Sequence, residues 1–342
     1  MTEIKLNKGI LLIPALICLL AVTSVRAEEI VASELLSKMG NSKVKVNFRG
    51  NQVVISFQVP NPNVSRVLVA QLIPNLGKKE IISSTGESTE VIIEDGKYQW
   101  RYIPSHRLII KRPQENPDEA RERANENIKL VQKNYYVKVG EKQNLVNRST
   151  FVITLQPRVA NRPKHWIWVD KDSGVPLKTE VYSTKGQLAM VSTYSKIDFA
   201  PNLTGEDFKL QIPKKESVRE MEEKANLELA SAEKLFGEKV MLPNYLPSGF
   251  ILRDIALSFI GGKRRLQLLY SDGLSSVSVF QETGRSLPGK GIAFQKGVKR
   301  TEPLSYSRGL NNIMGFPIGN RQIMLVGDIS EEEIAKIAQS LP

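Results

Sequence analysis

Turn-forming residues recur about every 8 to 12 positions along much of this chain, and apolar and polar side chains alternate between them. Residues 52–59 and 66–72 show the alternation, and Pro60-Asn61-Pro62 separates the two segments. A period of two places successive side chains on opposite faces of a strand. Short strands joined by such turns form antiparallel sheets that curl, so the first part of the chain is predicted to be a sandwich or a barrel.

The same alternation and the same kind of turn define the remaining strands of this part. The predicted strands are 44–48, 52–59, 66–72, 79–83, 90–94, 98–103, 107–111, 135–139, 151–155, 165–169, 177–182 and 188–199. A short helix over 33–39, with Ser33 as its N-cap, is expected before the first of them.

A longer helix interrupts the strand pattern. Asn116-Pro117-Asp118-Glu119 supplies an N-cap residue, a proline at the first helical position and acidic residues in the first turn. Ala120 and Ile128 lie on one apolar side, which predicts a helix over 117–133. This helix either packs as core on the end of the curled sheet or covers a cavity as a lid, and the sequence leaves both interpretations open.

Residues 214–236 are dense in lysine and glutamate, with Met221, Ala225, Leu229 and Ala232 at helical spacing. This pattern predicts a largely solvated helix that links two domains. The chain then divides into a signal peptide (1–27), a first domain (28–213), the helical linker (214–237) and a smaller second domain (238–342).

The second domain combines strands with a terminal helix. Ser330 and Glu333 form a capping box in front of that helix. The predicted elements are strands 251–259, 264–270, 274–281 and 321–327 and the helix 331–341. The chain as a whole is therefore expected to be of the α+β class, with a curved antiparallel first domain and a smaller α+β second domain.

The first 27 residues have the composition of a secretory signal peptide. Lys5 and Lys8 form a basic start, residues 9–22 are almost wholly apolar, and Val25-Arg26-Ala27 offers a cleavage site. An uncleaved membrane anchor is the alternative, but the apolar run contains Pro14 and is shorter than a bilayer span requires. The mature protein is therefore expected in the periplasm.

The chain is strongly basic, with a formal net charge of +12. Export argues against nucleic acid as its counterpart, so anionic lipid head groups, lipopolysaccharide phosphates or an acidic protein become the expected partners. Lys263, Arg264, Arg265 and the run 296–300 place positive charge on the second domain, where it could attract an acidic partner.

Residues that carry catalysis or bind metals are sparse. The single cysteine, Cys18, lies in the signal peptide, and His106 and His165 are far apart in sequence and lie in or beside strands. Asp170 and Asp172 belong to a turn of ordinary composition. No nucleophile or nucleotide-binding motif is present, so neither an enzyme nor a cofactor nor a metal site is expected.

The three tryptophans occur in two aromatic pairs. Trp100 and Tyr102 share one face of a predicted strand, and Trp166 and Trp168 share one face of another. The pairs either fill the core of a curved sheet or line a concave cavity that is open to a lipid or a peptide.

The segment "YSDGLSSVSVFQE" (270–282) predicts a hairpin with Asp272-Gly273 as a two-residue turn. Leu274, Ser276, Ser278 and Phe280 would share one face of its second strand. Small hydroxyl side chains there either let the final helix pack on its own sheet or let a partner approach closely.

Four segments together resemble the RseB/MucB family of periplasmic regulators of the envelope-stress sigma factor. They are "YSDGLSSVSVFQE" (270–282), "NFRGNQVVIS" (47–56), "WIWVDKDSGVPLKTEVYSTKGQLAMVSTYSKIDF" (166–199) and "GNRQIMLVGDISEEEIAKIAQSLP" (319–342). The resemblance spans nearly the whole mature chain in the right order. It implies a LolA-like first domain, which is a half-open antiparallel barrel with a helical lid.

The resemblance also implies a function. Such regulators bind the periplasmic part of a membrane-spanning anti-sigma factor and shield it from a protease, and misfolded outer-membrane components or lipopolysaccharide relieve the block. Much of the contact would come from the second domain, with its hairpin. A periplasmic lipid or lipoprotein carrier is the alternative, and a homo-oligomer stays open.

Overall fold

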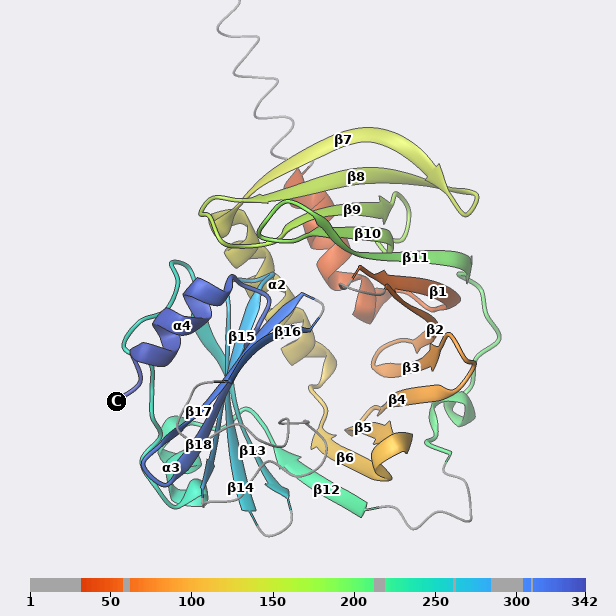
Figure 1. The fold of residues 1–342 in the computed structure, drawn as a ribbon. Coiled ribbons are helices and arrows are strands. Elements are labelled where there is room, and N and C mark those ends of the chain that lie inside the picture. Colours follow the sequence, from red (N-terminus) through yellow and green to blue (C-terminus); the bar gives the residue numbers. More distant parts are fainter. Residues whose placement is uncertain (1–31, 58–61, 212–218, 261–262, 284–303, 309) are drawn as a thin grey trace, which may run out of the picture.

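The computed structural model describes residues 32–57, 62–211, 219–260, 263–283, 304–308 and 310–342. The predicted signal peptide and the basic run 296–300 lie outside these residues. The chain forms two sheets, which are shown in Figure 1.

The first sheet has neighbouring strands that are all antiparallel, in the order β7–β8–β9–β10–β11–β1–β2–β3–β4–β5–β6. Its strands are β1 (Phe48–Ser56), β2 (Asn63–Leu72), β3 (Leu76–Ser83), β4 (Ser88–Asp95), β5 (Tyr98–Ile103), β6 (Leu108–Pro113), β7 (Tyr135–Leu145), β8 (Arg148–Pro157), β9 (Lys164–Asp170), β10 (Pro176–Tyr182) and β11 (Leu188–Asp198). Figure 1 shows them along an arc, which confirms the predicted curved antiparallel sheet.

Two helices lie inside the arc (Figure 1). The helix α2 (Pro117–Asn134) begins at the predicted N-cap, Asn116, whose side chain accepts hydrogen bonds from two backbone N–H groups. The Glu119 side chain accepts one from the Asn116 backbone N–H, which completes a capping box. The other helix covers residues 32–45. Leu36 of this helix and Val131 of α2 pack in one cluster with the inward side chains of β8 and β9.

The N-terminal helix is longer than predicted. Residues 44–45 are helical, and β1 begins at Phe48, so the expected strand 44–48 is wrong. Leu35, Leu36 and Met39 belong to the apolar cluster under the sheet, and this packing extends the helix through a segment whose own alternation favours a strand.

The second sheet is also antiparallel, in the order β13–β14–β15–β18–β17–β16. Its strands are β13 (Ile251–Ile260), β14 (Lys263–Ser271), β15 (Ser276–Thr283), β16 (Leu304–Arg308), β17 (Asn311–Ile318) and β18 (Arg321–Gly327). The helices α3 (Leu229–Phe236) and α4 (Glu331–Gln339) contribute to the apolar cluster on one face of it. Strands β16 and β17 were not predicted, because glycine and lysine interrupt the alternation before them.

A single strand joins the two sheets. In β12 (Arg219–Lys224), the first four residues pair in parallel with β6, and Glu223 and Lys224 pair antiparallel with β13. The prediction of one helix over 214–237 is therefore wrong for residues 219–224, which form β12, and is confirmed only for α3. The edges of both sheets offer unpaired backbone groups, and pairing with them outweighs the helical preference of glutamate and lysine.

Candidate functional site: the cleft and contact between the two sheets

The loop between β14 and β15 is wider than a two-residue turn. Ser271 pairs with Ser276, so four residues lie between them. The Asp272 carboxylate accepts hydrogen bonds from the backbone N–H groups of Leu274 (3.0 Å) and Ser275 (2.8 Å). The predicted Asp272-Gly273 turn is wrong because the aspartate side chain organises a longer loop.

This loop reaches across to the first sheet. The Leu274 side chain packs against the cluster that Leu36, Val131 and the inward residues of β8 and β9 form. At Gly273, which has φ +100°, an added Cβ would lie 2.7 Å from Leu130 Cβ and 2.8 Å from the Asn127 carbonyl oxygen of α2. Only glycine fits between the loop and the helix backbone.

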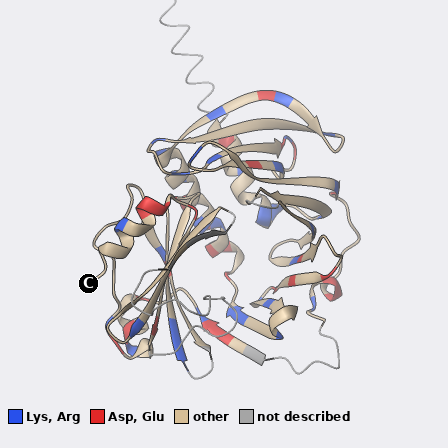
Figure 2. Cartoon of the chain, viewed as in Figure 1, with Lys and Arg blue, Asp and Glu red and all other residues tan. Residues whose placement is uncertain are grey.

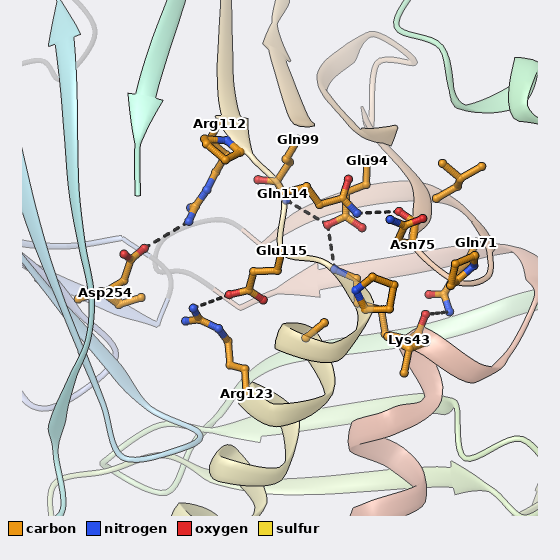
Figure 3. A pocket seen from close by; sticks show the side chains of 17 residues that line it. Lys43, Gln71, Asn75, Glu94, Gln99, Arg112, Gln114, Glu115, Arg123 and Asp254 are labelled. Atoms are coloured by element: carbon orange, nitrogen blue, oxygen red, sulfur yellow. Dashed lines mark hydrogen bonds and ion pairs between the residues drawn. The ribbon is translucent and has the colours of Figure 1, made fainter. Parts of the chain in front are cut away.

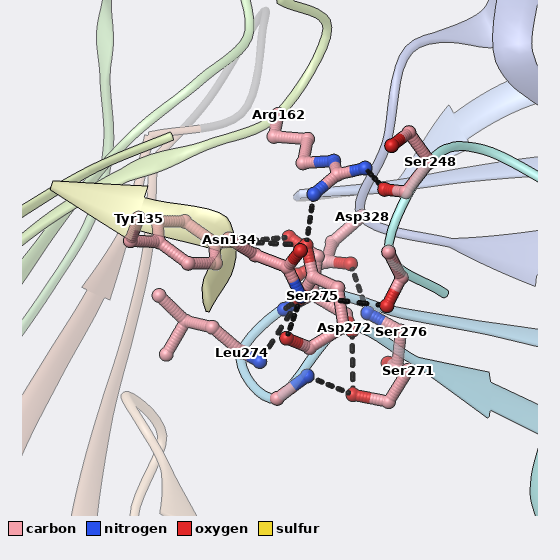
Figure 4. Close-up of polar contacts among 12 residues, drawn as sticks. Asn134, Tyr135, Arg162, Ser248, Ser271, Asp272, Leu274, Ser275, Ser276 and Asp328 are labelled. Carbon is pink, nitrogen blue, oxygen red and sulfur yellow. Dashed lines mark hydrogen bonds and ion pairs between the residues drawn. The ribbon is translucent and has the colours of Figure 1, made fainter. Parts of the chain in front are cut away.

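A buried ion pair crosses the same contact, as Figure 4 shows. Arg162 Nη1 lies 2.7 Å from Asp272 Oδ2, and the two side chains are 2% and 0% exposed. The Tyr135 hydroxyl donates to the same carboxylate oxygen at 2.9 Å. The Asn134 side chain donates to the Asp272 carbonyl at 2.9 Å, and Arg162 also donates to the Ser248 carbonyl.

These bonds bring together groups from both sheets. Asn134 and Tyr135 stand at the end of α2 and the start of β7, Arg162 lies just before β9, and Asp272 belongs to the second sheet. Burial, followed by the negative charge of Asp272, raises the pKa of Tyr135. The tyrosine therefore stays a neutral donor at physiological pH.

A second carboxyl, that of Asp328, contacts the start of β15 directly after the loop. Asp328 Oδ1 accepts a hydrogen bond from the backbone N–H of Ser276 at 2.7 Å. Burial raises the pKa of Asp328 to about 6, and the nearby charge of Asp272 acts in the same direction. The protonation of this carboxyl therefore changes under mildly acidic conditions.

A cleft of about 260 Å³ lies between the sheets on the side of α2 where the helix begins. Its walls come from the end of the N-terminal helix, from β2 to β6, from the first turns of α2 and from β13 and β14. Figure 3 shows its charged and polar side chains, which are Lys43, Gln71, Asn75, Glu94, Gln99, Arg112, Gln114, Glu115, Arg123 and Asp254.

Several charges of the cleft form ion pairs. Arg112 reaches from β6 to Asp254 on the second sheet (3.2 Å) and to Glu223 on β12 (3.4 Å). Lys43 pairs with Glu94 at 2.8 Å, within the first sheet and its helix. Burial raises the pKa of Glu223, although the Arg112 charge opposes the shift. The charges that line the cleft are thus largely balanced.

An apolar surface continues from the cleft over the second sheet. Leu269 lines the cleft, pairs with Ser278 and lies on the face opposite to the helix-covered core. Phe280 pairs with Met324 on that same face, and its residues are half-buried. We call these five residues, Leu269, Ser276, Ser278, Phe280 and Met324, the open face.

The structure divides the residues that were predicted to bind a partner. Ser276, Ser278 and Phe280 share the open face, and Ser278 accepts a hydrogen bond from Gln267 at 2.9 Å. Leu274 instead contacts the first sheet. In the basic triplet, Arg264 donates a hydrogen bond to the Phe236 carbonyl, and Arg265 lies 3.7 Å from Glu282. Both arginines are therefore engaged in internal contacts. Lys263 is half-buried at the start of β14.

The two aromatic pairs do not come together. Trp100 packs in a cluster with Phe208 of the short 3₁₀ helix η2 (Gly205–Phe208), and Tyr102, which is buried, lies on the same face of β5. Trp166 and Trp168 lie seven strands away on β9, with ring centroids 6.4 Å apart. None of the four lines the cleft.

His165 and Asp170, two residues with possible catalytic or metal chemistry, lie buried in the described part of the chain. It contains no group of three or more histidine, cysteine or acidic side chains that could bind a metal ion. Burial lowers the pKa of His165 to about 4, so this histidine is neutral at physiological pH. Asp170 accepts from the Ser173 backbone and from Arg148, which makes it part of an anchored turn.

Sequence reasoning missed Arg162, Tyr135 and Asp254, which connect the sheets. No local signal marks them, because each interacts with a residue more than 100 positions away in sequence. Among the described residues, no helix has the length and apolar character needed to cross a bilayer.

Comparisons with known proteins identify the family of the chain and solved structures with a similar fold. Residues 31–212 match the model of the MucB/RseB N-terminal domain, and the chain belongs to the MucB/RseB family. No curated protein matches the chain.

Solved structures share the fold over nearly its whole length. The complex of Pseudomonas aeruginosa MucA and MucB is similar at 16% identity and a TM-score of 0.62, covering 91% of this chain and 98% of that one. A crystal structure of MucB in complex with MucA(peri) gives 16% identity and a TM-score of 0.60 with the same coverage. A crystal structure of MucB alone gives a TM-score of 0.56 at the same identity and coverage.

The buried pair predicts a large effect of one substitution. Arg162→Met leaves the Asp272 carboxylate buried without its cation, which should lower the free energy of unfolding by about 3–5 kcal/mol. Urea unfolding monitored by circular dichroism measures this change. Arg121→Met, which removes an exposed pair with Asp118, is the control and should change stability by less than about 1 kcal/mol. A loss at Arg162 no larger than at Arg121 would contradict the assignment.

The close contact between Gly273 and α2 predicts a second effect on stability. Gly273→Ala should destabilise the protein by about 1–3 kcal/mol more than Gly86→Ala, because the added methyl group collides with α2. Gly86 is a matched control, since its φ is +88° and nothing lies within 4 Å of its added Cβ. Equal losses in the same unfolding assay would show that only the backbone angle matters.

The raised pKa of Asp328 predicts a pH dependence. Between about pH 4 and pH 6 the folded state keeps a proton that the unfolded state has released, so rising pH favours unfolding. Asp328→Asn keeps an acceptor for Ser276 and does not titrate. Wild-type stability relative to this variant should therefore fall by up to about 3 kcal/mol from pH 4 to pH 6.5. Parallel stability curves for the two proteins would refute this prediction.

Proposed function

We propose that the protein is a non-enzymatic periplasmic regulator that binds the periplasmic segment of a membrane-anchored anti-sigma factor. Membership of the MucB/RseB family supports this proposal most directly. The likeness in fold to MucB bound to MucA adds support. In this proposal residues 28–213 and 238–342 act as two domains, and the first domain is LolA-like.

We place the partner on the open face and across the cleft. The open face offers half-buried apolar side chains beside two serines, so a partner backbone can come close while leucine, phenylalanine and methionine give it apolar contact. The adjoining cleft offers paired charges that can exchange partners with an incoming polar segment. One segment can therefore touch both sheets.

The contact between the sheets has a role in this function. A partner that spans both sheets binds most tightly when their relative position is preorganised. The Arg162–Asp272 pair and the Gly273 contact with α2 provide that preorganisation. Sensing of envelope damage would then act through signals that move the sheets relative to each other, with a lipid or a misfolded peptide as the signal.

The cleft between the sheets suits a carried lipid poorly. The cleft has charged walls and a volume of about 260 Å³, which is below the usual range for a pocket that encloses a drug-sized ligand. The aromatic pairs, which by sequence could either fill the core or line an apolar cavity, lie apart. The binding experiment below distinguishes a lipid carrier from the proposed regulator.

The binding experiment uses calorimetric titration of the protein with the periplasmic segment of the anti-sigma factor from the same organism. Phe280→Ala should weaken binding by about tenfold or more, because an aromatic anchor at the centre of an interface is lost. Phe259→Ala is the matched control, since this phenylalanine is 44% exposed on the opposite face of the same sheet. It should leave the affinity unchanged.

The outcomes separate the functions. Binding by the wild type that only Phe280→Ala weakens supports the regulator and the open face. Binding that both variants leave unchanged supports the regulator but moves its interface elsewhere. No binding by the wild type, together with copurified lipid detected by mass spectrometry, would support the carrier.

A further inference from the structure

The outer surface of β7 to β10 carries exposed aromatic side chains that the cleft does not use. Tyr136 of β7 is 52% exposed and Trp166 of β9 is 37% exposed. Their neighbours Val137 and Ile167 pack inward with the helices. Alternation along the strands therefore turns Tyr136 and Trp166 to the opposite, outer side of the arc.

The aromatic rings form one cluster. The Trp166 ring lies 6.1 Å from the Tyr182 ring of β10 and 6.4 Å from that of Trp168. The strand register extends the cluster towards the sheet edge, because Lys164 pairs with Tyr182 and Thr154 pairs with both Trp166 and Lys138. Clustered aromatic rings on an outer sheet face are unusual for a surface that only meets water.

Basic side chains surround these rings. Arg158 lies over the Tyr136 ring at 4.2 Å, and Lys164 lies over the Tyr182 ring at 5.4 Å. Lys138 stands exposed in the same row as Trp166. None of Lys138, Arg158 and Lys164 forms an ion pair with a described residue. Figure 2 shows basic positions on β7, at the outer end of the arc.

The Glu180 carboxylate, in the middle of this surface, is paired with a lysine. Glu180 lies next to Trp166 across the strand pair. Its oxygens accept from Lys178 at 2.7 Å and from the Tyr182 hydroxyl at 2.9 Å. The surface formed by Tyr136, Lys138, Arg158, Lys164, Trp166 and Tyr182, which we call the aromatic–basic face, therefore has a clear excess of positive charge.

We propose that the aromatic–basic face docks on the surface of a bilayer that contains anionic phospholipid. Tryptophan and tyrosine prefer the boundary between head groups and acyl chains, where an apolar ring and a polar edge are both satisfied. Lysine and arginine beside them bind anionic head groups while their apolar stems cover the rings. The chain that follows the predicted cleavage site remains strongly basic, which adds long-range attraction to such a surface.

The geometry suits a membrane better than a deep ligand. The face is the outside of a curved sheet, so it touches a planar surface over a limited area and encloses nothing. Docking there leaves the cleft and the open face accessible, because inward and outward side chains of the first sheet lie on opposite sides. A membrane-anchored partner could therefore be bound while the protein rests on the same bilayer.

The test is cosedimentation of the exported protein with vesicles of phosphatidylcholine, with and without phosphatidylglycerol, at low and high salt. The wild type should bind only the anionic vesicles and lose binding as salt rises. Lys138→Glu combined with Lys164→Glu should weaken partitioning by about tenfold or more, since each lysine near an anionic surface contributes roughly fivefold. Trp166→Ser should weaken it several-fold.

The control is Lys129→Glu combined with Lys234→Glu, which changes the net charge equally at exposed positions elsewhere. It should weaken binding far less than the first pair. Equal effects of the two pairs, or no binding to anionic vesicles, would overturn the proposal. Binding to a soluble acidic polysaccharide but not to vesicles would also overturn it, and would assign the face to that ligand.

Phe280→Ala separates this proposal from the proposed function. It should reduce binding of the anti-sigma segment and leave vesicle binding unchanged. Loss of vesicle binding in this variant would place the lipid contact on the open face and reject the aromatic–basic face. Vesicle binding by a wild type that does not bind the anti-sigma segment would leave the membrane proposal standing alone.

Discussion

The buried pair of Arg162 and Asp272 determines how the two sheets sit together. Both side chains are almost completely removed from water, and a charge in such a place is tolerated only beside its counterion and with its other hydrogen bonds made. Arg162 therefore binds Asp272 and the Ser248 carbonyl, and Asp272 binds Tyr135 as well. A sliding motion of the sheets would break several of these bonds at once, so one relative position is favoured over its neighbours.

The loop between β14 and β15 shows why its sequence is small and polar. One carboxylate oxygen of Asp272 binds Arg162, and the other accepts hydrogen bonds from the loop backbone. Gly273 lies so close to α2 that a side chain would not fit there. Leu274 then contacts the first sheet, while the serines of β15 begin the open face. A motif that local patterns assign to a hairpin turn therefore serves mainly to join two sheets, and one face of its second strand belongs to the proposed partner surface.

Much of the secondary structure follows from local sequence, and most of the contact between the sheets does not. Alternation predicts most strands of the first sheet, and the N-cap residue, the proline and the first-turn acids at 116–119 predict α2, because both kinds of signal act within a few residues. Arg162 lies in an ordinary polar loop, and its partner is 110 positions away, so no local pattern identifies it. The segment that forms β12 favours a helix by composition, and it becomes a strand only because two sheet edges flank it.

The curvature of the first sheet gives the two proposed surfaces their independence. Side chains alternate along β9. Ile167 and Val169 point to the helices, and Trp166 and Trp168 point outward. One strand thus supplies core to the inside and aromatic rings to the outside. The cleft and the open face lie at the junction with the second sheet, where Arg112 and Asp254 meet. A substitution on the outer side therefore changes membrane contact without moving the buried pair, and for this reason the two binding events can be measured separately in one protein.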